Sequence, residues 1–252
     1  MRLPGLFRHA AEETLNALYP PRCVVCGRTD RLAADVAGFC TLCLARLPHR
    51  RPPDRLLSCH SGRQASERAP GLQVVAATYY EGELRDLLLK LKFHQDAGVH
   101  NALSSLAERA LRAEFSRSLP WPEVVAAVPL HAGRLRERGY NQAGLIAADV
   151  AHAIGADDQS SALLRVRATR RQSAVPDRAE RDANLTGAFR VADPLKIRGR
   201  AVVIVDDVLT SGATMQACAE SVARFAPAAL YGLVVACGRP QAIRIDSVPY
   251  DG

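Results

Sequence analysis

The chain has 252 residues, of which 48% are hydrophobic and 23% are charged. This is the composition of a globular protein with one or two domains and a sizeable core, and because no apolar stretch reaches the roughly 18 residues that cross a bilayer, a transmembrane helix is excluded. The net charge of +7 arises mostly near the N-terminus, where residues 1–70 hold 11 arginines and 6 acidic residues. Such an excess suits either an anionic partner, such as nucleic acid or a phosphorylated metabolite, or a merely solvated surface.

Residues 1–18 are expected to form an amphipathic helix, because their apolar residues recur at helical spacing. Glu12, Glu13 and Asn16 interrupt the apolar run that a secretory signal needs. We therefore expect a cytoplasmic protein without membrane insertion, whose thiols stay reduced and are free to bind metal.

Four of the seven cysteines form two close pairs within residues 19–47. Cys23 and Cys26 form one Cys-x-x-Cys pair, and Cys40 and Cys43 form another after thirteen intervening residues. Two such pairs can hold Zn²⁺ tetrahedrally, and a segment this short lacks a core and needs a metal to fold. We therefore predict a small zinc ribbon in which these four thiolates bind one structural Zn²⁺.

Residues 48–71 are rich in Pro, Arg, Ser and Gly, so they are predicted to be a linker. Over residues 72–240, strands and helices are predicted to alternate, which is typical of a doubly wound α/β fold with a mainly parallel sheet. Residues 241–252 are expected to be a polar tail. The expected strands span 72–80, 124–129, 163–166, 189–192, 201–205 and 231–236. The expected helices span 83–93, 102–115, 142–154 and 215–225. The polar stretch 167–187 is expected to be a long functional loop.

Residues 203–214 combine the end of an apolar strand, two acids, a Thr/Ser/Gly turn and the start of a helix. Ligands of open α/β sheets bind at the carboxyl ends of strands, and the free N–H groups of a helix N-terminus favour a phosphate. The two acids can accept the hydroxyls of a sugar diol, and Gly212 permits close backbone approach. The residues expected to form this ribose-phosphate cradle are Asp206, Asp207, Val208, Leu209, Thr210, Ser211, Gly212, Ala213 and Thr214.

This segment resembles the phosphoribosyl pyrophosphate (PRPP) motif of type I phosphoribosyltransferases. The resemblance extends over almost the whole chain and narrows to the ComF family, in which such a domain follows an N-terminal zinc ribbon. A second ribbon, frequent in that family, is degenerate here, because Gly62 stands where a cysteine would pair with Cys59. The other stretches that carry the resemblance are 79–82, 90–93, 128–131, 134–143, Gln172, Arg181, Asn184 and 187–189.

By this resemblance, Asp206 and Asp207 are the catalytic acids that contact the ribose 2′- and 3′-hydroxyls, and the turn at 210–214 holds the 5-phosphate. The loop after the strand at 124–129 binds pyrophosphate, residues 167–187 close over the substrate, and Mg²⁺ enters with PRPP, held mainly by substrate oxygens and waters.

The residues expected to bind the pyrophosphate are His131, Arg134 and Arg138, because guanidinium forks match its oxygens. A structural hydrogen bond is an equal alternative for His131. Lys90 and Lys92 are expected at a solvated helix end rather than beside the ligand.

Two functions remain open. In the first, the protein is a PRPP-dependent phosphoribosyltransferase with an unidentified acceptor. In the second, it is a non-catalytic protein associated with competence and DNA uptake, whose zinc module and basic surface bind single-stranded DNA or a partner protein of the competence machinery. The tail contains no aromatic clamp for a nucleobase, so it does not identify an acceptor. A homodimer also stays open.

Overall fold

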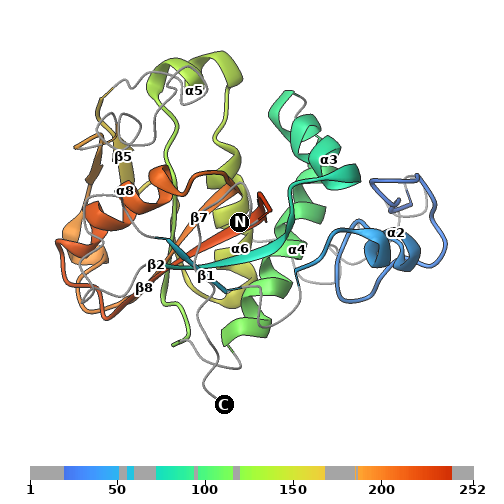
Figure 1. The fold of residues 1–252 in the computed structure, drawn as a ribbon, viewed down its shortest axis with the longest axis horizontal. Coiled ribbons are helices and arrows are strands. Elements are labelled where there is room, and N and C mark those ends of the chain that lie inside the picture. Colours follow the sequence, from blue (N-terminus) through green and yellow to red (C-terminus); the bar gives the residue numbers. More distant parts are fainter. Residues whose placement is uncertain are drawn as a thin grey trace, which may run out of the picture.

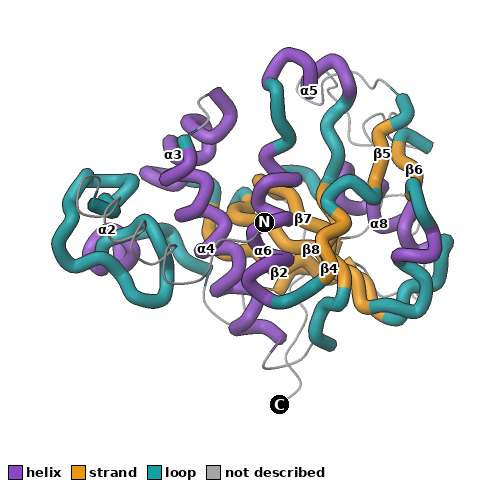
Figure 2. Tube along the Cα trace, turned by 180° about the vertical axis from the view of Figure 1, so that it is seen from behind, coloured by secondary structure: helices purple, strands orange, loops and turns teal. Residues whose placement is uncertain are grey.

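The computed structural model describes residues 20–50, 56–59, 72–93, 96–115, 120–167, 185 and 187–239 (Figure 1). The helix expected at 1–18, the tail at 241–252 and nearly all of the expected closing loop lie outside these residues. Figure 2, seen from behind, shows the cysteine-rich segment around α2 (Thr41–Arg46) at one end of the molecule and two short strands, β5 (Leu163–Arg165) and β6 (Phe189–Val191), at the other.

A six-stranded sheet forms the centre of the fold, in the order β1-β2-β8-β7-β3-β4. Five neighbouring strands, β2, β8, β7, β3 and β4, run parallel to one another, and β1 pairs antiparallel with β2 at one edge. The predicted α/β fold with a mainly parallel sheet is therefore confirmed. The strand bounds are β1 Leu56–Cys59, β2 Leu72–Tyr79, β3 Val124–Ala127, β4 Asp157–Gln159, β7 Ala201–Leu209 and β8 Ala229–Cys237.

Helices cover both faces of this sheet (Figure 1). Alternate strand residues point to opposite faces. Val203 of β7 accordingly packs in the core formed with α3, α4 and α6, whereas Ile204 packs in the core formed with α8. Burial of each helix's apolar stripe on one face of the sheet is what holds the layers together. The helix bounds are α3 Gly82–Phe93, α4 Ala97–Phe115, α5 Ala132–Arg138, α6 Gln142–Ile154 and α8 Ala213–Ala223, and a 3₁₀ turn, η2, spans Pro194–Lys196.

The remaining two strands form a separate antiparallel pair. The sequence predicts strands at both positions but does not separate them from the main sheet. β5 (Leu163–Arg165) pairs with β6 (Phe189–Val191), with Arg165 opposite Phe189. The Ser221 hydroxyl of α8 donates to the Phe189 carbonyl at 3.2 Å, so this small sheet is attached to the outer helix.

Several boundaries differ from the prediction for local reasons. Part of the predicted linker is strand β1, which gains its hydrogen bonds from β2. Helix α4 begins five residues earlier than expected, because the Asp96 carboxylate accepts the backbone N–H groups of Gly98 at 2.9 Å and Val99 at 3.1 Å. The polar edge strand β4 and the short helix α5 were not predicted. Neither has the apolar pattern of a core element.

The cysteine-rich segment packs against α4 rather than standing apart. Val36 and Phe39 are fully buried in the same core as the leucines of α4. The backbone approaches the helix closely at Gly38, where a Cβ atom would lie 2.6 Å from the Cβ of Ala102 and where φ is +75°. The Ala37 N–H also donates to the Ser105 hydroxyl at 2.9 Å. The segment is therefore continuous with the core of the main domain.

Candidate functional site: the crevice between β3 and β7

The strand order of the sheet reverses between the neighbouring strands β3 and β7. From β3 it proceeds through α6 to β4 at one edge, and from β7 through α8 to β8 on the other side. These two helices lie on opposite faces of the sheet. Such a switch point leaves a crevice at the carboxyl ends of the two strands, where open α/β sheets bind their ligands.

Strand β7 continues past its neighbour at this point. β3 pairs with β7 only as far as Val205, whereas β8 pairs with β7 as far as Leu209. The predicted end of this strand at residue 205 was therefore wrong, because β8 alone keeps the backbone extended. Asp206 and Asp207 consequently lie on a strand segment whose β3 side is open.

The turn from β7 into α8 has the expected glycine directly before the helix N-terminus. Gly212 is the N-cap of α8, with φ of 78° and ψ of −12°, and as a glycine it has no side chain with which to cap the helix. This left-handed conformation favours glycine. The N–H groups of the first helical turn have no partner within the helix, so they and the helix dipole favour an anion. The Ser211 hydroxyl lies 3.5 Å from the Ala213 nitrogen, which keeps its oxygen at this turn.

The two acids form a tight pair beside a cation. The Asp207 N–H donates to the Asp206 carboxylate at 2.8 Å, and the Asp207 carboxylate lies 3.4 Å from the Lys92 ammonium. Burial, followed by the charge of Asp207, raises the pKa of Asp206 well above its usual range, and Lys92 opposes this shift. Ionisation of Asp206 beside Asp207 therefore costs free energy.

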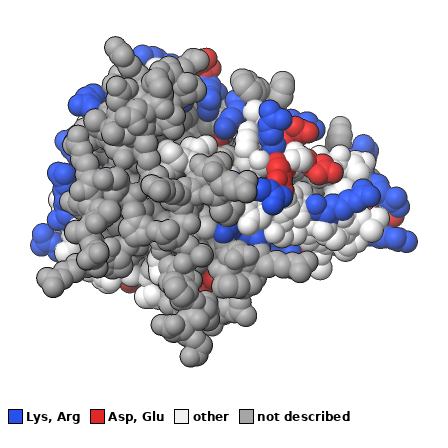
Figure 3. Space-filling view, in the orientation of Figure 1, with Lys and Arg blue, Asp and Glu red and all other residues white. Residues whose placement is uncertain are grey.

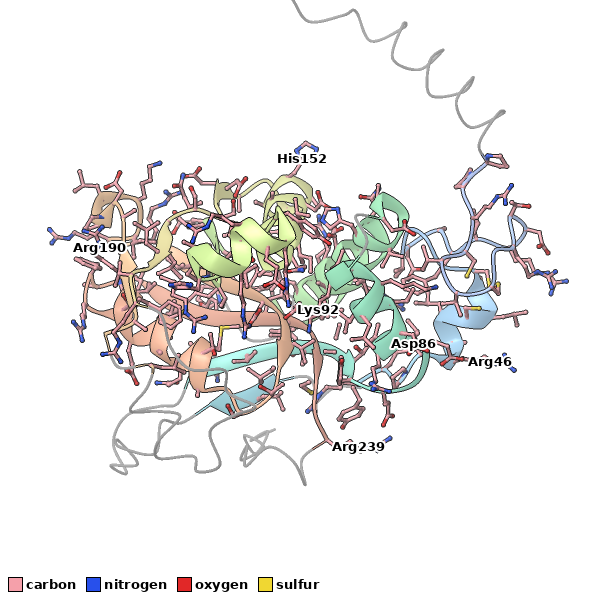
Figure 4. All side chains as sticks on the ribbon, turned by 90° about the horizontal axis from the view of Figure 1, so that it is seen from above. Arg46, Asp86, Lys92, His152, Arg190 and Arg239 are labelled. Carbon is pink, nitrogen blue, oxygen red and sulfur yellow. The ribbon has the colours of Figure 1, made fainter. Side chains whose placement is uncertain are left out.

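Lys92 corrects the expectation of a solvated helix end. Its side chain is only 24% exposed and pairs with Asp207, whereas Lys90 is exposed. Figure 4 places Lys92 near the centre of the molecule, and Arg46 and Arg239 at its periphery. No local pattern distinguishes the two lysines, because the pairing depends on where the packing of the elements places the last turn of α3 relative to β7.

Helix α5 follows β3 and carries the predicted pyrophosphate ligands. The His131 Nδ1 atom accepts a hydrogen bond from the Gly133 N–H at 3.2 Å, so this histidine caps the N-terminus of α5. This is the kind of structural hydrogen bond that the sequence left open as the alternative to a ligand role. Arg138 donates to the Gln142 side chain at 3.3 Å. Arg134 is half-buried, and Arg136 is exposed. Burial lowers the pKa of Arg165 on β5, and the charge of Arg134 acts in the same direction.

Two contacts tie α5 and its flanking turns to the neighbouring elements. The Asn141 side-chain amide donates to the Val128 carbonyl at 3.0 Å, and the Tyr140 hydroxyl donates to the Leu91 carbonyl of α3. Leu91 directly precedes Lys92. The bond from Tyr140 therefore connects the turn after α5 with the part of α3 that contacts Asp207.

Arg165 of β5 was missed by the sequence reasoning. Its guanidinium carbon lies 5.5 Å from the centre of the Phe189 ring. Burial and then the charge of Arg134 lower the pKa of Arg165, and the charge of Asp206 opposes the shift. The alternation of a three-residue strand placed Arg165 on the same face as the buried Leu163, but that signal is weak without knowledge of where β5 packs.

The four paired cysteines converge as predicted. Their sulfur atoms all lie within 4.8 Å of one another, and the Cys26 and Cys40 sulfurs are 3.8 Å apart. Burial opposes ionisation of Cys23, but backbone N–H groups, first that of Cys26, lower the pKa of this thiol to about 6. Burial raises the pKa of Cys43. Four convergent sulfurs fit a tetrahedral metal ion that binds thiolates.

The other described cysteines are core residues. Cys218 and Cys237 are fully buried, as expected. The Cys237 sulfur also accepts from the Arg50 guanidinium at 3.1 Å, which ties the end of the cysteine-rich segment to the last strand. The side chain of Cys59 lies outside the described residues.

Comparisons with known proteins identify the family of this chain. Residues 145–250 match the family model described as the phosphoribosyl transferase domain. The DNA utilization protein YhgH of Salmonella typhi is 34% identical over 203 residues, which cover 80% of this chain and 84% of that protein. Competence protein F of Haemophilus influenzae is 27% identical over 202 residues, covering 77% of this chain and 87% of its own. This chain belongs to the ComF family.

One solved structure, described as the allosteric regulatory enzyme of purine biosynthesis, aligns with this ComF protein over 54% of the present chain and 26% of its own, with 20% identity and a TM-score of 0.35. The family match itself extends from α6 through the cradle to β8. Gln172, Arg181 and Asn184, which carry part of the family resemblance, lie outside the described residues. Among the helices that the structure does describe, none is long and apolar enough to cross a membrane.

Proposed function

We propose that this ComF protein binds PRPP in the crevice between β3 and β7 and transfers, or holds, its 5-phosphoribosyl group. The observation that carries the proposal is the acid pair on the open end of β7, followed after a short turn by a helix N-terminus whose N-cap is Gly212. The 5-phosphate would accept hydrogen bonds from the N–H groups at the start of α8 and from the hydroxyls of Thr210, Ser211 and Thr214. The ribose hydroxyls would donate hydrogen bonds to Asp206 and Asp207.

The charges of the site favour this assignment. Burial and the charge of Asp207 disfavour the ionised form of Asp206, as its raised pKa shows. The two hydroxyls of a ribose diol would donate hydrogen bonds to the two carboxylates and so stabilise their ionised forms. Arg134 and Arg138 would bind the diphosphate, as the family resemblance implies. Mg²⁺ would enter with the substrate and neutralise part of its charge, held mostly by phosphate oxygens and water.

In the transfer reaction, the bond between the anomeric carbon and the diphosphate oxygen breaks, and its electron pair leaves with the diphosphate. An acceptor lone pair then forms the new bond to that carbon, and the acceptor loses a proton. This chain's residues would hold the ribose at its diol and stabilise the departing negative charge with guanidinium groups and backbone N–H groups. The acceptor is the part of the reaction that the site does not identify.

We also propose that the four-cysteine cluster binds one Zn²⁺ in a structural role. All four positions around the ion would be occupied by protein sulfur, which leaves no open position for a substrate. The burial of Val36 and Phe39 against α4 makes this small segment part of the main core. The metal would thus stabilise the domain rather than take part in its chemistry.

The binding proposal is tested by calorimetric titration of PRPP with Mg²⁺ into the purified protein. We expect saturable binding with a dissociation constant well below about 1 mM, which corresponds to a binding free energy more favourable than about −4 kcal/mol. Pyrophosphate release in the presence of a nucleobase panel then tests transfer. Absence of binding at millimolar PRPP would refute the proposal, and binding without release from any acceptor would favour a holding role.

A second candidate function is binding of single-stranded DNA or a competence protein in the cytoplasm. The names of the two relatives favour it, as does the basic surface of the cysteine-rich segment. Figure 3 shows Lys and Arg side chains along the end of the molecule that holds α2. Arg22, Arg31 and Arg46 are exposed there. Fluorescence anisotropy with a labelled oligonucleotide should show affinity that falls with salt and with alanine at these three arginines.

A further inference from the structure

The acid pair on β7 is held by the backbone on one side and by a lysine on the other. The Asp206 Oδ1 atom accepts the Asp207 N–H at 2.8 Å, and the Asp207 Oδ1 atom accepts the Val208 N–H at 2.8 Å. Each carboxylate is thus oriented through one of its oxygens, and its second oxygen is the one that can accept a hydroxyl. The second oxygen of Asp207, Oδ2, lies 3.4 Å from the Lys92 ammonium.

The last turn of α3 brings Lys92 to this carboxylate. The Lys92 side chain is 24% exposed and that of Asp207 is 17% exposed, so water and salt screen their attraction less than at an open surface. The Tyr140 hydroxyl donates to the Leu91 carbonyl, which ties this turn of α3 to the turn between α5 and α6. A separation of 3.4 Å is longer than the roughly 2.8 Å of a direct charge-assisted hydrogen bond. The ammonium therefore offsets the charge of Asp207 and leaves Oδ2 able to accept a hydroxyl.

We propose that Lys92 is a positioning residue for the ribose diol, which stabilises the ionised, oriented acid pair that accepts the two hydroxyls. The inference rests on the proposed function and gives a role to a residue for which the ComF resemblance supplied none. Two adjacent carboxylates repel each other, and a cation beside one of them lowers the cost of keeping both charged. The charge of Lys92 accordingly opposes the rise in the pKa of Asp206.

Two other roles for Lys92 predict different results. A lysine that bound the diphosphate directly would affect the affinity for pyrophosphate, which has no diol. A merely structural lysine, which only joins α3 to β7, would affect thermal stability and the affinity for every ligand alike. A positioning residue for the diol should affect PRPP and ribose 5-phosphate but not pyrophosphate. The choice of ligand therefore separates the three roles.

The experiment is calorimetric titration of PRPP, ribose 5-phosphate and pyrophosphate, each with Mg²⁺, into wild type, Lys92→Met and Lys92→Arg. Lys90→Met is the matched control, because Lys90 lies on the same helix and is exposed. For Lys92→Met we expect affinity for PRPP and ribose 5-phosphate to fall about 5- to 30-fold, and affinity for pyrophosphate to fall less than about threefold. Lys92→Arg keeps the positive charge, so it should restore most of the lost affinity.

A ligand that lacks one hydroxyl provides a second readout. A lysine that acts through the acid pair has less to act on when the sugar offers one donor instead of two. The loss caused by Lys92→Met should therefore be smaller for 2-deoxyribose 5-phosphate than for ribose 5-phosphate, because the two changes remove parts of one interaction. A structural role predicts the same loss for both sugars.

Thermal unfolding of each variant shows whether the fold is retained, and Lys92→Gln, which also removes the charge, provides the test if Lys92→Met does not fold. Wild-type affinity for PRPP in the neutral variant would overturn this inference while leaving the proposed function intact. So would an equal loss for pyrophosphate, an equal loss for the two sugars, or no recovery in Lys92→Arg. If wild type itself binds neither PRPP nor ribose 5-phosphate, both the inference and the proposed function fail.

Discussion

Replacing Asp206 with asparagine should stabilise the folded protein and weaken PRPP binding at the same time. Burial and the charge of Asp207 raise the pKa of Asp206, so its ionised form costs free energy in the ligand-free protein. Asparagine has nearly the same shape and removes that charge. We expect the free energy of unfolding at pH 7 to rise by about 0.5–2 kcal/mol, which is about 1–8 °C in Tm for a chain of this size.

The loss of affinity follows from the same charge. A carboxylate accepts a ribose hydroxyl more strongly than an amide oxygen does, so PRPP binding should weaken by about 1–2 kcal/mol, or about five- to thirtyfold. The assays are thermal unfolding and calorimetric titration. Asp86→Asn on α3 is the control, since Asp86 is an exposed acid that Figure 4 labels at the surface. A less stable Asp206→Asn protein that binds PRPP as wild type does would refute the reasoning.

The stability gain should also depend on pH with a definite sign. The folded-state pKa of Asp206 lies above the unfolded value of about 4. Below about pH 4 the residue is protonated in both states, and the variant should have no electrostatic advantage. As pH rises toward the folded pKa, the unfolded chain ionises first and wild-type stability falls. The difference between the two proteins should therefore widen with rising pH, and a difference that shrinks would contradict the assignment.

Three further predictions concern the cradle, the metal and the loop. Alanine at both Asp206 and Asp207 should weaken PRPP binding by about 3–6 kcal/mol if the two terms add, as titration would show, and binding within twofold of wild type would disprove the diol assignment. Elemental analysis should find one zinc per chain, lost in the Cys23→Ser/Cys40→Ser variant, whose Tm should fall because the segment packs on α4. Proteolysis within residues 167–187 should slow when PRPP and Mg²⁺ are added, and equal rates would count against closure of this loop.

The sequence alone predicted those features whose signal is local. Alternating apolar strands and amphipathic helices indicated a parallel α/β sheet, because each element must bury one face or both. The spacing of Cys23, Cys26, Cys40 and Cys43 predicted their convergence, since two tight turns suffice to bring the sulfurs together. The cradle was also recognisable, because the acids, the turn and the helix N-terminus are contiguous in the chain.

Contacts between distant segments could be read only from the tertiary structure. Lys92 pairs with Asp207 although 115 positions separate them in the chain, and no pattern near either residue predicts that the last turn of α3 comes close to β7. Arg165 lies against the Phe189 ring only because β5 and β6 form a two-stranded sheet apart from the main one, which is joined to α8 through Ser221. The cysteine-rich segment likewise joins the main core through Phe39 and α4. Periodicity specifies which face of an element is apolar, whereas the charges that meet at a strand end depend on how whole elements pack.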